Sequence, residues 1–242
     1  METLNNIVLT IQNYMSNYVL IIALLGAGLW FSFRLGFIQV RGFGEGMRRT
    51  FGGLFSKKGE AGADGMSSFQ ALATAIAAQV GTGNIAGAAT ALAIGGPGAI
   101  FWMWIAAFLG MATIYAEAIM AQKYKTVGAD GQVTGGPVYY IRAAFKGTFG
   151  KVLAGIFAIL ITLALGFMGN AVQSNSIAAS FHTAFGIPQW IMGLVVAVIA
   201  IFVFMGGMKR IAKVTETIVP FMAALYIIGS LIVIIYNYKN IP

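Results

Sequence analysis

Two glycines alternate with two polar residues in the second apolar stretch of the sequence, as Gly81-Thr82-Gly83-Asn84. Each glycine in a helix interior is less favourable than alanine by roughly 1 kcal/mol. A helix interrupted here would end in carbonyl groups without donors, those of Gln79, Val80 and Gly81, and would restart with free N–H groups. Such carbonyls can bind a cation and such N–H groups a carboxylate, so the segment predicts a discontinuous helix at a binding site.

The same four residues have an alternative interpretation. Small residues are enriched wherever transmembrane helices pack closely, and the alanines around this segment fit that role. Thr82 and Asn84 favour the binding site, because polar side chains at membrane depth are costly and tend to be functional. Irregular backbone is also tolerated in a membrane only against protein or a wet cavity.

A second polar group lies on a later apolar stretch and comprises Gly166, Gly169, Asn170 and Gln173. Their spacing of i, i+3, i+4 and i+7 places them on one face of a helix. One interpretation is a surface that faces a substrate, with room beside two amides. The other is hydrogen bonding between helices, which contributes only about 0.6 kcal/mol on average. The sequence alone leaves both open.

The remaining chemically active residues point to no enzyme. Glu117 lies about two helical turns before Lys123, so we interpret it as an interfacial acid that reaches water or a lysine. His182 and the tryptophans fit interfacial positions or packing. The sequence has no cysteine, no Cys/His metal cluster and no nucleotide-binding, protease or hydrolase motif. We therefore expect no catalysis, no cofactor and no metal apart from a coupling ion.

The amino-acid composition indicates which class of protein holds these candidate site residues. The 242 residues are 59% hydrophobic and only 9% charged, against about 25% charged in a soluble domain. We therefore predict an all-α integral membrane protein with about six transmembrane helices. These helices are expected over residues 18–33, 67–96, 99–122, 152–181, 190–205 and 215–235.

The basic residues predict the orientation of these helices. With the N-terminus outside, every one of the 15 Lys and Arg residues except Lys239 falls in three links on the cytoplasmic side, as the positive-inside rule requires. The net charge of +8 is therefore a topology signal and indicates no nucleic-acid partner. We expect a multi-pass protein of the plasma (inner) membrane, with the lipid bilayer as its surroundings.

Residues 81–124 carry a recognisable pattern. The segment GTGNIAGAATALAIGGPGAIFWMWIAAFLGMATIYAEAIMAQKY, and above all GGPGAIFWMW at 95–104, resembles the signature of the alanine/glycine:cation symporters, also called sodium:alanine symporters. The likeness extends over essentially the whole chain. It implies Na⁺-coupled inward transport of alanine or glycine, with H⁺ as the alternative ion.

The resemblance also implies a fold and roles for individual residues. These proteins resemble the leucine transporter, in which two inverted five-helix repeats surround a site near the bilayer midplane. Residues 1–65 would hold an extra helix and a basic link, and residues 66–242 the first repeat, with its first helix broken near 81–84. The substrate carboxylate would meet Thr82, Gly83 and Asn84. The pocket would be lined by Gly166, Gly169, Asn170 and Gln173.

The chain departs from the family in lacking the second repeat. That repeat would supply the second broken helix and the other cation ligands, so the lone half is expected to be incomplete. The expected partner is a missing C-terminal half or a second-repeat polypeptide. The alternatives are an inverted pair of copies, and a non-transporting membrane remnant or assembly subunit. The one-sided basic pattern argues against the inverted pair.

Overall fold

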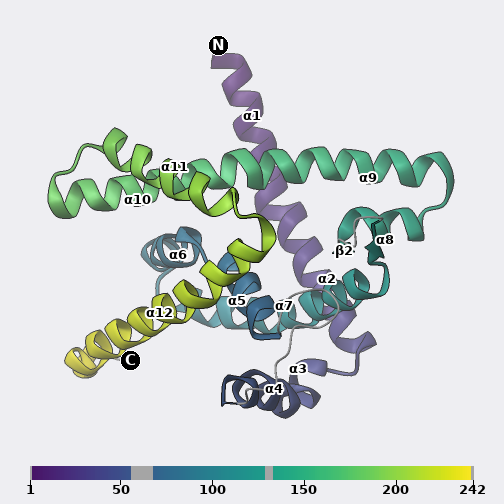
Figure 1. Ribbon diagram of the computed structural model, residues 1–242, viewed down its shortest axis with the longest axis horizontal. Helices are drawn as coiled ribbons and strands as arrows, with labels where there is room; N and C mark the ends of the chain where they lie inside the picture. The colour runs from purple at the N-terminus through teal and green to yellow at the C-terminus, as the bar shows by residue number, and fades with distance from the viewer. Residues whose placement is uncertain (1, 56–67, 129–132, 241–242) are drawn as a thin grey trace. The chain divides into compact units, whose positions relative to one another are not determined.

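A computed structural model describes residues 2–55, 68–128 and 133–240 of the chain, and this part is mostly helical (Figure 1). By their contacts, the residues form two compact units, each taking two stretches of sequence. The first unit comprises Met1–Arg48 and Thr90–Leu160, and the second comprises Arg49–Ala89 and Ile161–Pro242. Each unit is described by itself below.

The described residues form helices and two short strands. In chain order they are α1 (Glu2–Tyr14), the π-helix η1 (Met15–Leu20), α2 (Ile21–Arg34), α3 (Ile38–Arg41), α4 (Phe43–Phe55), α5 (Ser68–Gln79), the π-helix η2 (Gly83–Gly87), α6 (Ala88–Gly95), α7 (Gly98–Lys123), β1 (Thr126–Val127), β2 (Val133–Thr134), α8 (Pro137–Ala144), α9 (Gly147–Ile161), the π-helix η3 (Thr162–Gly169), α10 (Asn170–Phe185), α11 (Gln189–Phe204), α12 (Gly207–Tyr236) and the 3₁₀-helix η4 (Tyr238–Asn240).

Four helices of the described chain are long and apolar enough to cross a membrane. They cover Asn5–Arg34, Gly98–Lys123, Gly147–Phe185 and Gly207–Tyr236, and two shorter apolar helices cover Gly83–Gly95 and Gln189–Phe204. Large apolar side chains are exposed along these helices, as expected where lipid replaces water. The prediction of a mostly helical membrane protein is therefore confirmed, while the count of six crossings stays a prediction.

Several predicted boundaries were wrong. The first helix begins well before residue 18, because α1 and η1 continue into α2 without a break. The last helix begins at Gly207 instead of 215. It extends beyond the apolar run, because the long basic side chains in its first turns can keep their charged ends in water. The first basic link contains α3 and α4. The predicted domain boundary between residues 65 and 66 lies outside the described residues.

Close packing of α2 against α7 forms the core of the first unit (Figure 1). A Cβ added at Gly28 of α2 would lie 2.8 Å from the Leu109 Cβ and 3.1 Å from the Leu109 carbonyl oxygen. Leu109 itself is buried, as is Ala112 one turn later. Glycine at position 28 therefore sets how closely the two helices approach.

Two buried polar residues complete this contact. The Ser32 hydroxyl donates to the Gly28 carbonyl over 2.7 Å, and the Gln39 amide donates to the Ser32 oxygen over 2.6 Å. The same Gln39 nitrogen lies 3.2 Å from the Phe108 carbonyl oxygen. The buried Gln39 Oε1 accepts no hydrogen bond from the described chain. These bonds hold α3 against α2 and α7.

Replacing Gly28 by alanine is expected to destabilise the first unit by about 1–3 kcal/mol, because the new methyl group would collide with the Leu109 Cβ and crowd the Leu109 backbone on α7. Gly26, on the same helix, has open space around its Cβ position and provides the matched control. Gly26→Ala should be neutral or stabilising, since alanine favours helix. Thermal unfolding followed by circular dichroism measures both variants. Equal midpoints of thermal unfolding for the two variants would contradict the close contact between α2 and α7 at Gly28.

The link after α7 contains a short hairpin that the sequence analysis missed. β1 pairs antiparallel with β2, with Thr126 opposite Thr134 and Val127 opposite Val133. The sequence signal was present, because Asp130-Gly131 between two Thr/Val pairs is typical of a hairpin turn. The short helix α8 follows this hairpin.

In the second unit, α12 packs against α5 and α11, and α11 packs against α10 (Figure 1). Small or branched residues fill the contact between α5 and α12, where Ala73, Ala212 and Val219 are buried. The hydroxyl oxygens of Thr74 and Thr215 lie 3.1 Å apart across it. The described part of α5 is therefore anchored along α12 just before the segment that carries the candidate site.

Candidate functional site

The predicted interruption lies between α5 and η2 in the second unit. α5 ends at Gln79, Val80 and Gly81 are not helical, and the π-helix η2 begins at Gly83. No described residue donates a hydrogen bond to the carbonyl oxygens of Gln79 or Val80. These two oxygens are thus free to bind a cation in the way that helix C-termini do.

Asn84 closes the turn at the interruption. Its side-chain oxygen accepts a hydrogen bond of 2.9 Å from the Gly81 N–H. Its own N–H donates to the Gly81 carbonyl over 3.1 Å. This reciprocal pair resembles a helix cap, in which a polar side chain binds a backbone N–H that has no helical partner. Two groups that we expected to be open for ligands, the Asn84 N–H and the Gly81 carbonyl, therefore already bind each other.

Gln173 on α10 contacts the interruption directly. Its Oε1 accepts a hydrogen bond of 3.1 Å from the Thr82 N–H. Its Nε2 lies so close to Gly81 that a Cβ at that position would collide with it. Only glycine admits the amide here, which gives a physical reason for Gly81. The two sequence groups that were predicted separately thus meet through this one residue.

The other three residues of the second group do not reach the interruption within the described chain. Asn170 donates to the Gly166 carbonyl over 3.1 Å, which is a bond within the helix. A Cβ at Gly169 would lie 3.2 Å from the Ala164 carbonyl oxygen. Gly166 and Gly169 lie in η3, the wider π-helical segment before α10. π-helical segments frequently occur at functional sites.

The interruption is accessible on one side. Gly83 and Asn84 are exposed, Gly81 and Thr82 are half-buried, and an added Cβ at Gly83 would meet no atom within 4 Å. The Gly83 N–H has no hydrogen-bond partner among the described residues. A carboxylate could therefore approach this backbone without displacing a side chain.

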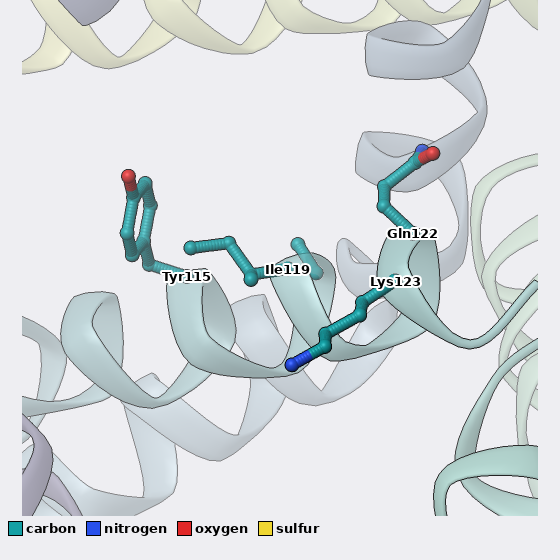
Figure 2. Close-up of a pocket in the computed structure, with 5 residues that line it drawn as sticks. Tyr115, Ile119, Gln122 and Lys123 are labelled. Carbon is teal, nitrogen blue, oxygen red and sulfur yellow. The ribbon is translucent and has the colours of Figure 1, made fainter.

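A hollow of about 470 Å³ lies along α7 in the first unit and contains none of the predicted site residues. Figure 2 shows Tyr115, Ile119, Gln122 and Lys123 beside it, and Ala118 completes the lining. All five residues come from one helix, and the hollow is wide open. It therefore lacks the convergent polar groups that identify a site for a charged amino acid.

Glu117 on α7 acts on Tyr140 of α8, which packs against α7. Burial raises the pKa of the Tyr140 hydroxyl above 10.0, and the negative charge of Glu117 raises it further. Because the folded-state pKa is the higher one, the unfolded chain releases this proton first. The stabilising contribution is therefore complete below pH 10.0 and is lost as the pH rises through the folded-state value.

Replacing Glu117 by glutamine is expected to lower the pKa of Tyr140, although burial will keep it above 10.0. The measurement is an alkaline absorbance titration of tyrosinate. The sequence has nine tyrosines, so the Tyr140→Phe protein supplies the difference spectrum that isolates this one. An identical titration of Tyr140 with and without Glu117 would show that the two groups do not interact.

Glu216 on α12 is a polar residue that the sequence analysis missed. The Gln70 amide donates to its carboxylate over 2.9 Å at the contact between α5 and α12. The signal was a single acid within the last apolar stretch, four residues before Pro220. Within the part of the chain that the structure covers, no group of three or more His, Cys, Asp or Glu could hold a metal ion.

Comparisons with known proteins give a consistent result. A model of the sodium:alanine symporter family matches residues 1–242. The sodium/alanine symporter AgcS of Methanococcus maripaludis is 43% identical over 96% of this chain and 51% of its own. The putative sodium/proton-dependent alanine carrier YrbD of Bacillus subtilis is 48% identical over 90% of this chain and 43% of its own.

A third relative differs in its named substrate. The probable sodium/glutamine symporter GlnT of Bacillus subtilis is 41% identical over 100% of this chain and 49% of its own. The chain thus spans about half the length of the curated relatives it matches. The predicted family resemblance is confirmed, and the transporter names confirm the prediction that this is no enzyme.

Proposed function

Because the chain belongs to the sodium:alanine symporter family, we propose that it forms part of a Na⁺-coupled symporter that carries alanine or glycine across the plasma membrane. The observation that supports this most is the interruption after Gln79, with free carbonyls on one side and the unpartnered Gly83 N–H on the other. At such an interruption, a cation can bind the carbonyl oxygens that end one helix, and a carboxylate can bind the N–H groups that begin the next.

The substrate would be held mainly by backbone. Its carboxylate would meet the Gly83 N–H and the Thr82 hydroxyl, and Gln173 would keep the interruption in shape. In the complete site, Gly166, Gly169 and Asn170 would limit the space for the substrate side chain. Na⁺ would bind the carbonyls of Gln79 and Val80, with Gly81 as a further ligand once the Asn84 bond opens. H⁺ is the alternative ion, since the relative YrbD is named a putative sodium/proton-dependent alanine carrier.

We also propose that the site needs a second half. The relatives are about twice as long, and the interruption is open on one side. The missing ligands would come from a second repeat, on the same or another polypeptide. Alternating access requires one repeat to move against the other, so this half would not transport alone.

The proposed topology has six crossings with the N-terminus outside. The segment from α5 through the interruption to α6 would form one crossing, beside the four long helices. α11 would form the sixth, since its 16 residues extend about 24 Å at 1.5 Å per residue. The three basic links would then be cytoplasmic.

The test is uptake of labelled alanine into vesicles that contain this chain together with a second-repeat polypeptide. Uptake should require both chains and an inward Na⁺ gradient. Uptake that persists when choline replaces Na⁺ would refute Na⁺ coupling. The alternative, a non-transporting membrane subunit, predicts no uptake and no thermal stabilisation of the chain by alanine with Na⁺.

A further inference from the structure

The helix α4 (Phe43–Phe55), in the first basic link, has one apolar face. Because an α-helix turns once about every 3.6 residues, five of its positions fall on roughly one third of its circumference. These positions are occupied by apolar residues, namely Phe43, Met47, Phe51, Leu54 and Phe55. Glu45 and Arg49 lie at positions on the opposite side. A helix with this pattern buries its apolar face against a protein or a lipid surface.

The start of α4 is not covered by any described segment. Residues 43–49 are all exposed, including Phe43 at 63% and Met47 at 43%. An added Cβ at Gly44 or Gly46 would meet no atom within 4 Å. The apolar side chains of this part of the helix therefore need a partner outside the described chain.

The position of α4 along the chain indicates which partner this is. α2 completes the apolar helix Asn5–Arg34, which is long enough to span a membrane, and α3 is held against α2 by the hydrogen bond from Gln39 to Ser32. α4 follows α3 after Gly42, whose carbonyl accepts a hydrogen bond of 2.8 Å from the Gly46 N–H. The first turn of α4 therefore begins close to the end of a membrane-spanning helix, where the lipid headgroups lie.

The charge of this segment favours an anionic surface. Residues 34–55 contain four arginines and one acid, Glu45, which is a net charge of +3. The arginines, all of which are exposed, are Arg34, Arg41, Arg48 and Arg49. A guanidinium group has several N–H donors and binds phosphate in a bidentate manner. The exposed ion pair of 2.7 Å between Arg48 and Glu45 contributes little to stability, so a phosphate can compete for Arg48.

We propose that α4 is an interfacial helix that binds anionic phospholipid. Its apolar face lies at the boundary between headgroups and acyl chains, and Arg48 and Arg49 bind the lipid phosphates. Lipid is favoured over a protein segment because a lipid surface is already present where α2 ends, and an anionic one complements the arginines. In the proposed topology this is the cytoplasmic leaflet. The inference goes beyond the proposed function and does not depend on transport.

The first test measures the depth of α4 by electron paramagnetic resonance of a single nitroxide label. The sequence has no cysteine, so Met47→Cys gives one labelling site on the apolar face, and Glu45→Cys gives the matched site on the other side. The chain is reconstituted in vesicles of phosphatidylcholine with phosphatidylglycerol. The label at 47 should be more accessible to oxygen, which concentrates in lipid, and less accessible to a water-soluble nickel chelate, than the label at 45.

Two results of this first test would overturn the proposal. If the nickel chelate reaches the labels at 47 and 45 equally well, α4 does not lie in the lipid surface. If the label at 47 is hidden from both oxygen and the chelate, a protein segment, such as a second copy of this chain, covers the apolar face instead.

The second test removes the charge that the proposal requires. An arginine near an anionic surface favours the bound state by about fivefold, so Arg48→Gln with Arg49→Gln should lower the ratio of bound to released α4 by about 25-fold. Lys209→Gln with Lys213→Gln removes the same charge from α12 and should leave the depth of α4 unchanged. If the double arginine variant does not insert, high salt on the unaltered protein decides, because it screens the same attraction. An unchanged depth in these conditions, or the same depth in phosphatidylcholine alone, would overturn the binding of anionic lipid.

Discussion

Replacing Gly83 by leucine is expected to weaken alanine binding by the assembled transporter at least about tenfold, which is about 1.4 kcal/mol. The leucine side chain would occupy the open space beside Gly83 through which a carboxylate reaches the free N–H. The fold should tolerate it, because an added Cβ at this position has no neighbour within 4 Å. Equilibrium binding of labelled alanine in the presence of Na⁺ measures the effect.

Gly87→Leu is the matched control for this prediction. Gly87 ends the same π-helix, is exposed, and also has nothing within 4 Å of an added Cβ. Both variants introduce the same side chain on the same element, so they share any general effect on η2. Binding should be affected much less by Gly87→Leu. Equal losses in the two variants would show that the Gly83 backbone is not the carboxylate site.

The sequence was sufficient to predict the helical membrane class and an interruption close to residues 81–84, although the non-helical residues are Val80 and Gly81, and Thr82 to Asn84 are helical. Both follow from local properties, namely the scarcity of charge and the helix-breaking pattern at residues 81–84. The link from Gln173 to the interruption was not predictable by spacing, because the four residues of its group share one helix face equally well. Only the structure separates Gln173, which contacts Thr82, from Asn170, which bonds within its own helix.

Other features depend on contacts between distant segments. Gln70 and Glu216 are 146 residues apart in the sequence, and nothing local indicates that they meet. The buried Gln39 likewise acquires its role from Phe108 on another helix. The start of α12 was misplaced because an apolar run marks the part of a helix inside the membrane, and the helix itself continues past its basic end.

Gly81→Ala is expected to weaken binding by a different route, through Gln173. The methyl group would collide with Gln173 Nε2, and the amide side chain would have to move away. The Thr82 N–H would then lose its acceptor. A hydrogen bond of this kind contributes about 0.5–1.5 kcal/mol, so alanine affinity should fall by about two- to tenfold. Binding in the presence of Na⁺ is again the measurement.

A double-mutant cycle with Gln173→Ala tests this route directly. If Gly81 is required only because it admits the amide, Gly81→Ala should have no further effect once Gln173 is alanine. The coupling between the two positions should then be about as large as the single effect of Gly81→Ala. Additive losses would mean that the glycine serves the backbone itself, through the turn that Asn84 closes. In that case the same variant should also lower the midpoint of thermal unfolding, which loss of the amide contact alone would change little.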